Sequence, residues 1–206
     1  YLSRCCAAID WLAAVIDPET GAVPNIGAND GARLYNLSSR PYSDFRPSVQ
    51  LGSALFMNEL VYDGCIGDDS IGWLGIKDLK TDKEKKTENK IFPDGGYVVL
   101  RRGEASGFVR FANFHFRPSH ADCLHFDFWY KGENILRDGG TFSYNTDPKW
   151  IDYFSGTESH NTVQFDERNQ MSRISRFLFG DWLKMTAVSD LQKENGTTYW
   201  SGSYKD

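Results

Sequence analysis

Several side chains that could bind a metal ion or take part in acid–base chemistry lie in one stretch of this 206-residue chain. His120 and Asp122 form a His-Ala-Asp motif, Asp138 begins Asp-Gly-Gly-Thr, and His160 lies in Ser-His-Asn-Thr-Val. Two imidazoles and one carboxylate are ordinary zinc ligands, with water or another group completing the site. Strand ends and neighbouring loops also hold polar side chains in positions that suit a reacting sugar. These motifs therefore predict a metal site or a sugar site.

The residues between the first two motifs predict a β-hairpin. Residues 122–130 are rich in types of high β-propensity, and successive side chains of a strand point to opposite faces. This alternation places Phe126 and Phe128 on the same face of the strand. Residues 131–134 supply a turn, and residues 135–138 form the returning strand before a Gly-Gly break. Both ends of this hairpin can therefore meet, and we expect its two Phe side chains to be buried.

The chain changes character along its length, which predicts three parts. Residues 1–76 contain two expected helices, at 3–16 and 48–60. Residues 77–92 carry many lysines and nearly as many acidic residues, so we expect an exposed, charged linker or loop. Residues 93–206 show the pattern of successive antiparallel strands, with no helical crossovers between them. This pattern predicts a β-sandwich, which we expect to be incomplete at Asp206. The expected strands of this last part are 97–102, 107–116, 122–130, 135–138, 161–166, 176–188 and 198–204.

Composition narrows the class of protein. A hydrophobic content of 40% indicates a folded protein, and most of the aromatic residues are expected in the sheet core, with some free to stack on sugars. The net charge of -5 argues against a nucleic-acid partner but not against an anionic polysaccharide at a local basic cleft. No apolar run is long enough to span a membrane, and no signal peptide is visible. The four cysteines form no CxxC pair and are expected to be free thiols or small core residues. Because the chain begins at Tyr1 rather than Met, we expect a fragment of a longer protein.

The order of these motifs is similar to the C-terminal sandwich of the heparinase II/III-like polysaccharide lyases. The matching blocks are the His-Ala-Asp motif at His120, the aromatic strand, Asp-Gly-Gly-Thr at Asp138, and Thr-x-x-His-Asn-Thr-Val from Thr157. Residues 24–31 also resemble a Pro-x-x-Gly-x-x-Asp loop that closes the helical toroid of those proteins. The matching blocks span roughly residues 1–185. The resemblance implies the last helices of an (α/α) toroid followed by a β-sandwich, in a bacterial periplasmic or secreted protein that cleaves an acidic polysaccharide by β-elimination.

The resemblance also implies a ligand set for a structural zinc ion. By matching the family's motifs, these ligands are His120, Asp138 and His160. Asp122 is the rival carboxylate, for which we favour a hydrogen-bonding role. We expect His115 and His125 to be hydrogen-bonded or surface residues rather than ligands.

The chemistry of β-elimination needs a group that neutralises the uronate carboxylate, a base and an acid. In the family the Asn and Tyr for this work come from the toroid, upstream of this chain, so the chain alone is expected to be inactive. The family's additional sandwich His falls at Pro118, which departs from the pattern. Tyr144 and Tyr153 are candidate acids, with packing as the alternative role. Arg117 could bind a uronate carboxylate with both arms of its guanidinium, with a surface ion pair as the alternative.

Two other functions compete with the lyase. His120, Asp122 and His160 have the two-histidine, one-carboxylate composition of a non-haem Fe(II) oxygenase. The carboxylate that lies beside the histidines distinguishes the two functions: Asp138 would indicate the lyase family's site, and Asp122 would indicate the oxygenase. A non-catalytic sugar-binding or interface module is the other alternative, and the sequence predicts no oligomeric state.

Overall fold

The computed structural model describes residues 1–29, 31–32, 35, 37–63, 66–81 and 88–205. These residues form two compact units, which we call the helical unit and the sheet unit. The helical unit contains Tyr1–Val23 and Arg33–Glu88, and the sheet unit contains Pro24–Ala32 and Asn89–Asp206. Residues 82–87 of the linker predicted at 77–92 lie outside the described residues.

The helical unit is organised by two helices that pack together, as the sequence predicts. Its elements are α1 (Leu2–Val15), α2 (Arg46–Met57), β1 (Glu59–Leu60), α3 (Asp68–Trp73) and β2 (Lys80–Thr81). Ile9, Ile16 and Val49 form its buried core. Gly52 permits this close packing, because a Cβ atom there would lie 2.6 Å from Cδ1 of Ile9. The two expected helices are therefore confirmed, with shifted ends.

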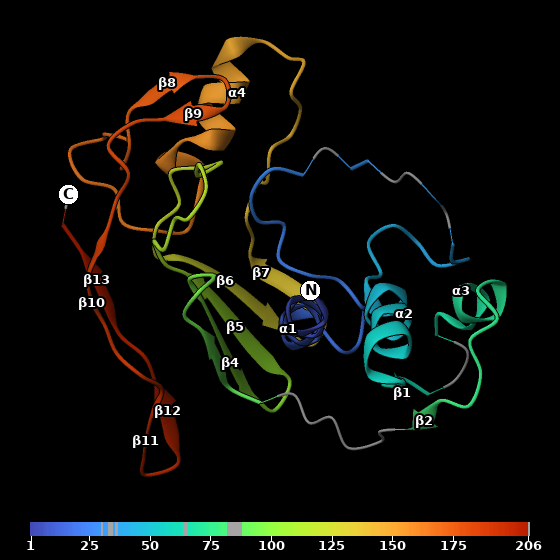
Figure 1. The fold of residues 1–206 in the computed structure, drawn as a ribbon. Helices are drawn as coiled ribbons and strands as arrows, with labels where there is room; N and C mark the ends of the chain where they lie inside the picture. The colour runs from blue at the N-terminus through green and yellow to red at the C-terminus, as the bar shows by residue number, and fades with distance from the viewer. Residues whose placement is uncertain (30, 33–34, 36, 64–65, 82–87, 206) are drawn as a thin grey trace. The chain divides into compact units, whose positions relative to one another are not determined.

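The sheet unit is built on an antiparallel sheet, in the order β3-β4-β5-β6-β7 (Figure 1). Its strands are β3 (Lys90–Phe92), β4 (Tyr97–Arg102), β5 (Ala105–Arg110), β6 (His125–Tyr130) and β7 (Glu133–Leu136). The register pairs Arg110 with Tyr97 on one side and with His125 on the other. The predicted antiparallel fold, with an α-helical segment before it, is confirmed.

The buried face of β6 is the polar one, so the predicted burial of Phe126 and Phe128 is wrong. Both Phe side chains are half-buried, whereas His125 and Asp127 are fully buried. Burial of polar groups is tolerated where they find hydrogen-bond partners. The Asn161 amide donates to Nδ1 of His125 at 3.1 Å, and the Trp129 indole donates to Asp127. The alternation was correct, but the side of the strand that faces the interior was not.

The strand predicted at 107–116 ends earlier than expected, because its partner strand stops. Arg110 pairs with Tyr97, the first residue of β4, and no ladder continues beyond it. The Phe111 amide instead donates to the Gly96 carbonyl at 2.8 Å. The Asn113 side chain donates to the Pro93 carbonyl at 2.7 Å. The turn before β4 therefore takes up the hydrogen bonds that a longer strand would have made.

The rest of the sheet unit departs further from the predicted strands. It contains α4 (Pro148–Ser155), the 3-10 helix η1 (Thr157–Ser159), β8 (Arg173–Ser175), β9 (Leu178–Phe179), β10 (Met185–Val188), β11 (Gln192–Glu194), β12 (Thr197–Tyr199) and β13 (Gly202–Tyr204). The strand predicted at 161–166 is absent, because side chains rather than a ladder hold that segment: Gln170 Nε2 donates to the Val163 carbonyl at 3.0 Å. The strand predicted at 176–188 is divided into β9 and β10. In Figure 1 the β10–β13 pair runs on into the β11–β12 hairpin as one ribbon.

Helix α4 was not predicted, although its start carries a recognisable signal. Asp147 caps the helix by accepting a hydrogen bond from the Lys149 amide at 3.0 Å, and Pro148 occupies the first turn. Both are common at helix starts, because the first amides of a helix lack intrahelical acceptors. Within the sheet unit, Ala112, Ala121, Cys123 and Met171 are the centre of the apolar core.

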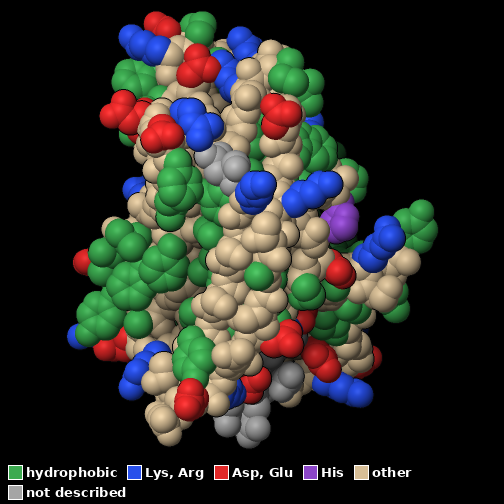
Figure 2. Space-filling view, turned by 90° about the vertical axis from the view of Figure 1, so that its left-hand side faces the viewer, with side chains coloured by type: hydrophobic (Ala, Val, Ile, Leu, Met, Phe, Trp, Pro, Cys, Tyr) green, Lys and Arg blue, Asp and Glu red, His purple; other side chains and the backbone are tan. Residues whose placement is uncertain are grey.

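The molecular surface shows no large area of one charge on the face drawn in Figure 2, where basic and acidic side chains are interspersed. None of the described helices is both long and apolar enough to cross a membrane. Cys5, Cys6 and Cys123 are free thiols, as expected, and Cys65 lies outside the described residues.

Candidate metal centre and the adjoining cavity

The structure brings the three predicted metal ligands together. One ligand atom each from His120, Asp138 and His160 lies within 4.8 Å of the others. Nδ1 of His160 is 3.4 Å from Oδ2 of Asp138, and the rings of His120 and His160 are 5.2 Å apart at their centroids. The exposed fractions of His120, Asp138 and His160 are 2%, 0% and 7%, so the cluster is buried.

Three different segments of the sheet unit position these side chains. His120 precedes β6, Asp138 lies just beyond the end of β7, and His160 follows η1. Thr157 joins two of the segments, because its hydroxyl donates to the Ala121 carbonyl at 2.9 Å and its carbonyl accepts from the His160 amide at 3.1 Å. The cluster therefore forms where the hairpin ends meet the segment after α4.

The cluster contains polar atoms that no described protein group satisfies. Nδ1 of His120, Oδ2 of Asp138 and both ring nitrogens of His160 are buried without a hydrogen-bond partner among the described residues. Buried polar atoms without partners are rare, since their desolvation costs free energy. Two imidazole lone pairs and a carboxylate oxygen that face one another suit a divalent cation. The donor set therefore fits a metal ion.

Thr141 fixes which nitrogen of His120 is available. Its hydroxyl donates to the Gly27 carbonyl at 3.0 Å and accepts from the Asn29 amide at 3.3 Å. The same oxygen lies 3.3 Å from Nε2 of His120. Because the single hydroxyl proton is directed to Gly27, Nε2 of His120 must be the donor, which leaves the Nδ1 lone pair free. Metal-binding histidines commonly donate their second ring N–H in this way.

Asp138 is held in place by the glycine that follows it in the motif. The Gly140 amide donates to Oδ1 of Asp138 at 2.7 Å. Gly140 has a φ of +66°, and a Cβ atom there would lie 2.2 Å from Nδ2 of Asn25, so no other residue type fits this position without strain. Burial raises the pKa of Asp138, but its contacts with His160, His125 and the Gly140 amide outweigh burial and lower that pKa overall. The carboxyl group is therefore ionised and ready to bind a cation.

His125 belongs to the surroundings of the site, although the sequence did not place it there. Its Nδ1 accepts from the Asn161 amide, so the proton resides on Nε2. Nε2 lies 3.6 Å from Oδ2 of Asp138 and 3.9 Å from Oδ2 of Asp127. His125 is thus a buried, hydrogen-bonded residue, as expected, but it faces the carboxylate of a candidate ligand. The alternation of β6 was the available signal, since it put His125 on the same face as Asp127.

Asp122 does not belong to the group of facing ligand atoms. It forms a buried ion pair with Arg110, and its exposed fraction is 0%. Asp138, and not Asp122, therefore supplies the carboxylate beside His120 and His160. This arrangement favours the heparinase-like ligand set over the Fe(II) oxygenase alternative. His115 is exposed at the surface, as expected.

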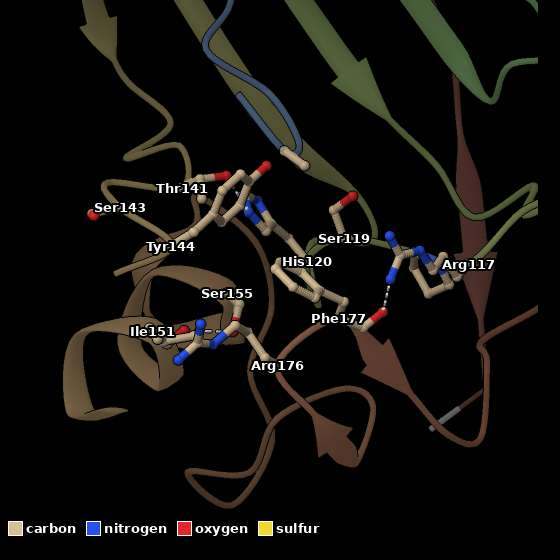
Figure 3. Close-up of a pocket in the computed structure, with 12 residues that line it drawn as sticks. Arg117, Ser119, His120, Thr141, Ser143, Tyr144, Ile151, Ser155, Arg176 and Phe177 are labelled. Atoms are coloured by element: carbon tan, nitrogen blue, oxygen red, sulfur yellow. Dashed lines mark hydrogen bonds between the residues drawn. The ribbon is translucent and has the colours of Figure 1, made fainter. Parts of the chain in front are cut away.

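A cavity of about 240 Å³ adjoins the metal cluster, with His120 in its wall (Figure 3). Arg117 and Tyr144, two of the predicted site residues, also line it. Pro118 lies in the wall as well, so this position carries no titratable side chain. Tyr153 is not among the lining residues; its ring packs against those of Trp150 and Phe154 on α4.

Comparison with known proteins places these features in a family context. Residues 84–205 match the family model described as heparinase II/III-like, C-terminal. A solved heparinase III shares 16% identity and a TM-score of 0.56, over 89% of this chain and 28% of that protein. The heparan sulfate lyase HepC from Pedobacter heparinus shares 17% identity and a TM-score of 0.56, over 91% of this chain and 26% of that protein. The chain thus spans about a quarter of the length of these structures, and the likeness shows a shared fold. No curated protein sequence gives a match.

Replacement of Thr141 tests the hydrogen bond that orients His120. We expect Thr141→Val, which keeps the side-chain shape but lacks the hydroxyl, to weaken zinc binding by about 10- to 100-fold. Thr141→Ser keeps the hydroxyl and should bind zinc nearly as the wild type does. Competition with a chromophoric chelator measures both affinities. Equal affinities for the valine variant and the wild type would show that this hydrogen bond does not orient the ligand.

The pH dependence of the metal-free protein tests the burial of His120. Burial, together with the nearby His160 and Arg110, lowers the pKa of His120 from 6.5 to about 4, against the opposing effect of Asp122 and Asp138. Between these two pKa values the unfolded chain binds a proton that the folded chain does not, so the free energy of unfolding falls as the pH falls through this range. We expect His120 to account for up to about 3 kcal/mol of this loss.

Chemical denaturation in the presence of a chelator, repeated across this pH range, measures the effect. The control is His120→Gln, which cannot titrate there and should show a shallower loss of stability. Parallel curves for the two proteins would contradict a neutral, buried His120.

Proposed function

This chain belongs to the heparinase II/III-like C-terminal family, and we propose that it is the metal-binding β-sandwich part of a lyase that cleaves an acidic, uronate-containing polysaccharide. The observation that carries this proposal is the buried cluster of His120, Asp138 and His160, which occurs within the matched residues. The structural neighbours, a heparinase III and a heparan sulfate lyase, support this proposal. A periplasmic or secreted bacterial location is part of the same proposal and rests on the family likeness.

We propose zinc as the ion of the cluster, in a structural role. His120 through Nδ1, Asp138 through Oδ2 and His160 through a ring nitrogen would hold it, because these are the buried atoms without partners. A bound ion would link the loop before β6, the end of β7 and the segment after η1. Its binding would therefore contribute to the stability of the sheet unit.

In the proposed reaction a base removes the proton α to the uronate carboxylate, and the electron pair forms a carbon–carbon double bond. The bond from C4 to the linking oxygen then breaks, and an acid protonates the leaving oxygen. From this chain, Arg117 is the candidate that binds the carboxylate, and Tyr144 is the candidate acid. Both line the cavity beside His120. Tyr153 is the weaker candidate acid because its ring packs within an aromatic cluster on α4. The base would come from outside this chain.

A non-catalytic sugar-binding module is the second candidate function. It is favoured by one observation, which is that the cavity contains Pro118 where the family's sandwich histidine is expected. The two functions differ in whether a protein that contains this chain produces unsaturated sugar ends.

Lyase activity separates the two functions. We expect the longer protein that contains this chain to produce unsaturated uronate ends, which absorb in the ultraviolet, from uronate polymers. The isolated chain should produce none, since part of the catalytic machinery lies outside it. In the longer protein, Tyr144→Phe should lower kcat by about 100-fold or more if Tyr144 is the acid, whereas Tyr153→Phe should have little effect. No product from the longer protein would favour the binding module, and product from the isolated chain would show that its own residues suffice.

A further inference from the structure

The buried face of β6 carries a pair of polar side chains that the proposed metal site does not use as ligands. His125 and Asp127 are both fully buried. Alternate residues of a strand point to the same face, so these two side chains lie next to each other inside the sheet unit. Neither belongs to the group of facing ligand atoms. Since burial of polar side chains costs free energy unless they are bound, their contacts decide what they do.

Asp127 anchors the main chain of the candidate ligand Asp138. Oδ2 of Asp127 accepts a hydrogen bond from the Asp138 amide at 3.3 Å. The same carboxylate accepts from the Trp129 indole through Oδ1, and from Nδ2 of Asn134 at 3.4 Å through Oδ2. All three donors are N–H groups, which is the environment that a buried carboxylate requires. Asp127 therefore ties the residue that follows β7 to strand β6.

His125 lies against two of the candidate ligands at once. Its Nε2 is 3.6 Å from Oδ2 of Asp138, and its ring meets the ring of His160 edge to face, with centroids 5.5 Å apart. Because Nδ1 of His125 accepts from the Asn161 amide, Nε2 carries the proton and has no lone pair for a cation. His125 can therefore support the ligands without being one of them.

The N–H group of His125 is an incomplete contact. Nε2 is buried without a hydrogen-bond partner among the described residues. It lies near two carboxylate oxygens, Oδ2 of Asp138 at 3.6 Å and Oδ2 of Asp127 at 3.9 Å, and both are beyond hydrogen-bond distance. A movement of about 0.5 Å would bring Nε2 within the usual distance of the nearer oxygen. The donor is thus placed to hold the Asp138 carboxylate in one orientation.

Asn161 connects this pair to the main chain beside both ligands. It directly follows His160, and its amide binds Nδ1 of His125 at 3.1 Å. Its side chain donates to the carbonyl of Arg137, the residue before Asp138, at 3.2 Å. The two segments that carry these ligands are therefore fastened to each other and to β6 through one residue.

From these contacts we propose that His125 and Asp127 are positioning residues for the metal site. Asp127 fixes the main chain of Asp138, and His125 fixes the orientation of its carboxylate. The inference rests on the proposed function, from which it takes the ion held by Asp138 and the two histidines. It adds that side chains outside the ligand set determine how tightly the ion binds. Loss of such supporting contacts typically lowers metal affinity by about 10- to 100-fold.

Two variants of His125 test its part in the proposal. His125→Asn keeps an oxygen that can replace Nδ1 as the acceptor for the Asn161 amide, but it loses the donor near Asp138. His125→Gln extends a side-chain N–H to the place of Nε2. In the chain of residues 1–206, competition with a chromophoric chelator should show zinc binding about 10- to 100-fold weaker in His125→Asn, with most of the affinity recovered in His125→Gln. Equal affinities for His125→Asn and the wild type would overturn the role of His125.

Asp127→Asn tests the second residue by the same measurement. The variant keeps the size of the side chain but replaces one acceptor oxygen with a donor, so it cannot accept from both Trp129 and Asp138. We expect zinc binding to weaken by about tenfold or more. Asp190→Asn makes the same change at an exposed position of the sheet unit and should bind zinc as the wild type does. Equal affinities for the two variants would overturn the role of Asp127.

The visible spectrum of bound Co²⁺ separates positioning from a merely structural role. Cobalt reports the geometry of its ligands, so His125→Asn and Asp127→Asn should shift its absorption bands. A loss of stability alone would leave the spectrum of the folded, cobalt-loaded protein unchanged. Chemical denaturation with a chelator measures the stability of the metal-free proteins separately. Lower metal-free stability with an unchanged cobalt spectrum in both variants would overturn the positioning role, and the His125 variants decide the matter if Asp127→Asn does not fold.

Failure of this inference differs from failure of the proposed function. If the wild type binds zinc and every variant binds it equally, the metal site stands and His125 and Asp127 do not position it. If the wild type binds no zinc, the metal site and the positioning role are both overturned. Unsaturated product from the longer protein tests the lyase independently of either result.

Discussion

The central constraint on the candidate site is a buried group of polar atoms that lack hydrogen-bond partners among the described residues. His120, Asp138 and His160 enclose this group, and the described contacts of the unit leave their facing atoms unsatisfied. In a low-dielectric interior such atoms destabilise the fold unless something binds them. A divalent cation would satisfy one atom of each residue, which are Nδ1 of His120, Oδ2 of Asp138 and one ring nitrogen of His160. We therefore propose that the cluster is a metal site that joins three segments.

The surroundings of the cluster are consistent with this explanation. Thr141 and Gly140 fix the orientation of two ligands and bring the Pro24–Ala32 loop against them. His125 faces the carboxylate of Asp138 from the buried side of β6. On the other side, His120 forms part of the wall of a cavity that Arg117 and Tyr144 also line. His120 is thus shared by the metal cluster and the wall of the cavity.

The sequence was most informative where short motifs and alternation act locally. It predicted the hairpin that brings His120 near Asp138 and the antiparallel fold, and the family resemblance pointed to the three residues that the structure groups together. It failed where tertiary partners decide the outcome. Phe126 and Phe128 were expected inside, but the partners available to His125 favour burial of the polar face. The strand through residues 111–116 was lost because β4 begins at Tyr97 and offers no partner beyond that point. The place of Arg176 beside the cavity depends on a turn that alternation alone does not reveal.

The most direct test of this account is the zinc content of the purified chain after zinc is supplied and excess ion is removed. Elemental analysis would compare the wild type with His160→Ala and with His115→Ala, a matched control because His115 is exposed and outside the cluster. The account predicts a bound zinc ion in the wild type and in His115→Ala, and a loss of zinc from His160→Ala. Equal zinc in all three proteins, or none in the wild type, would contradict it.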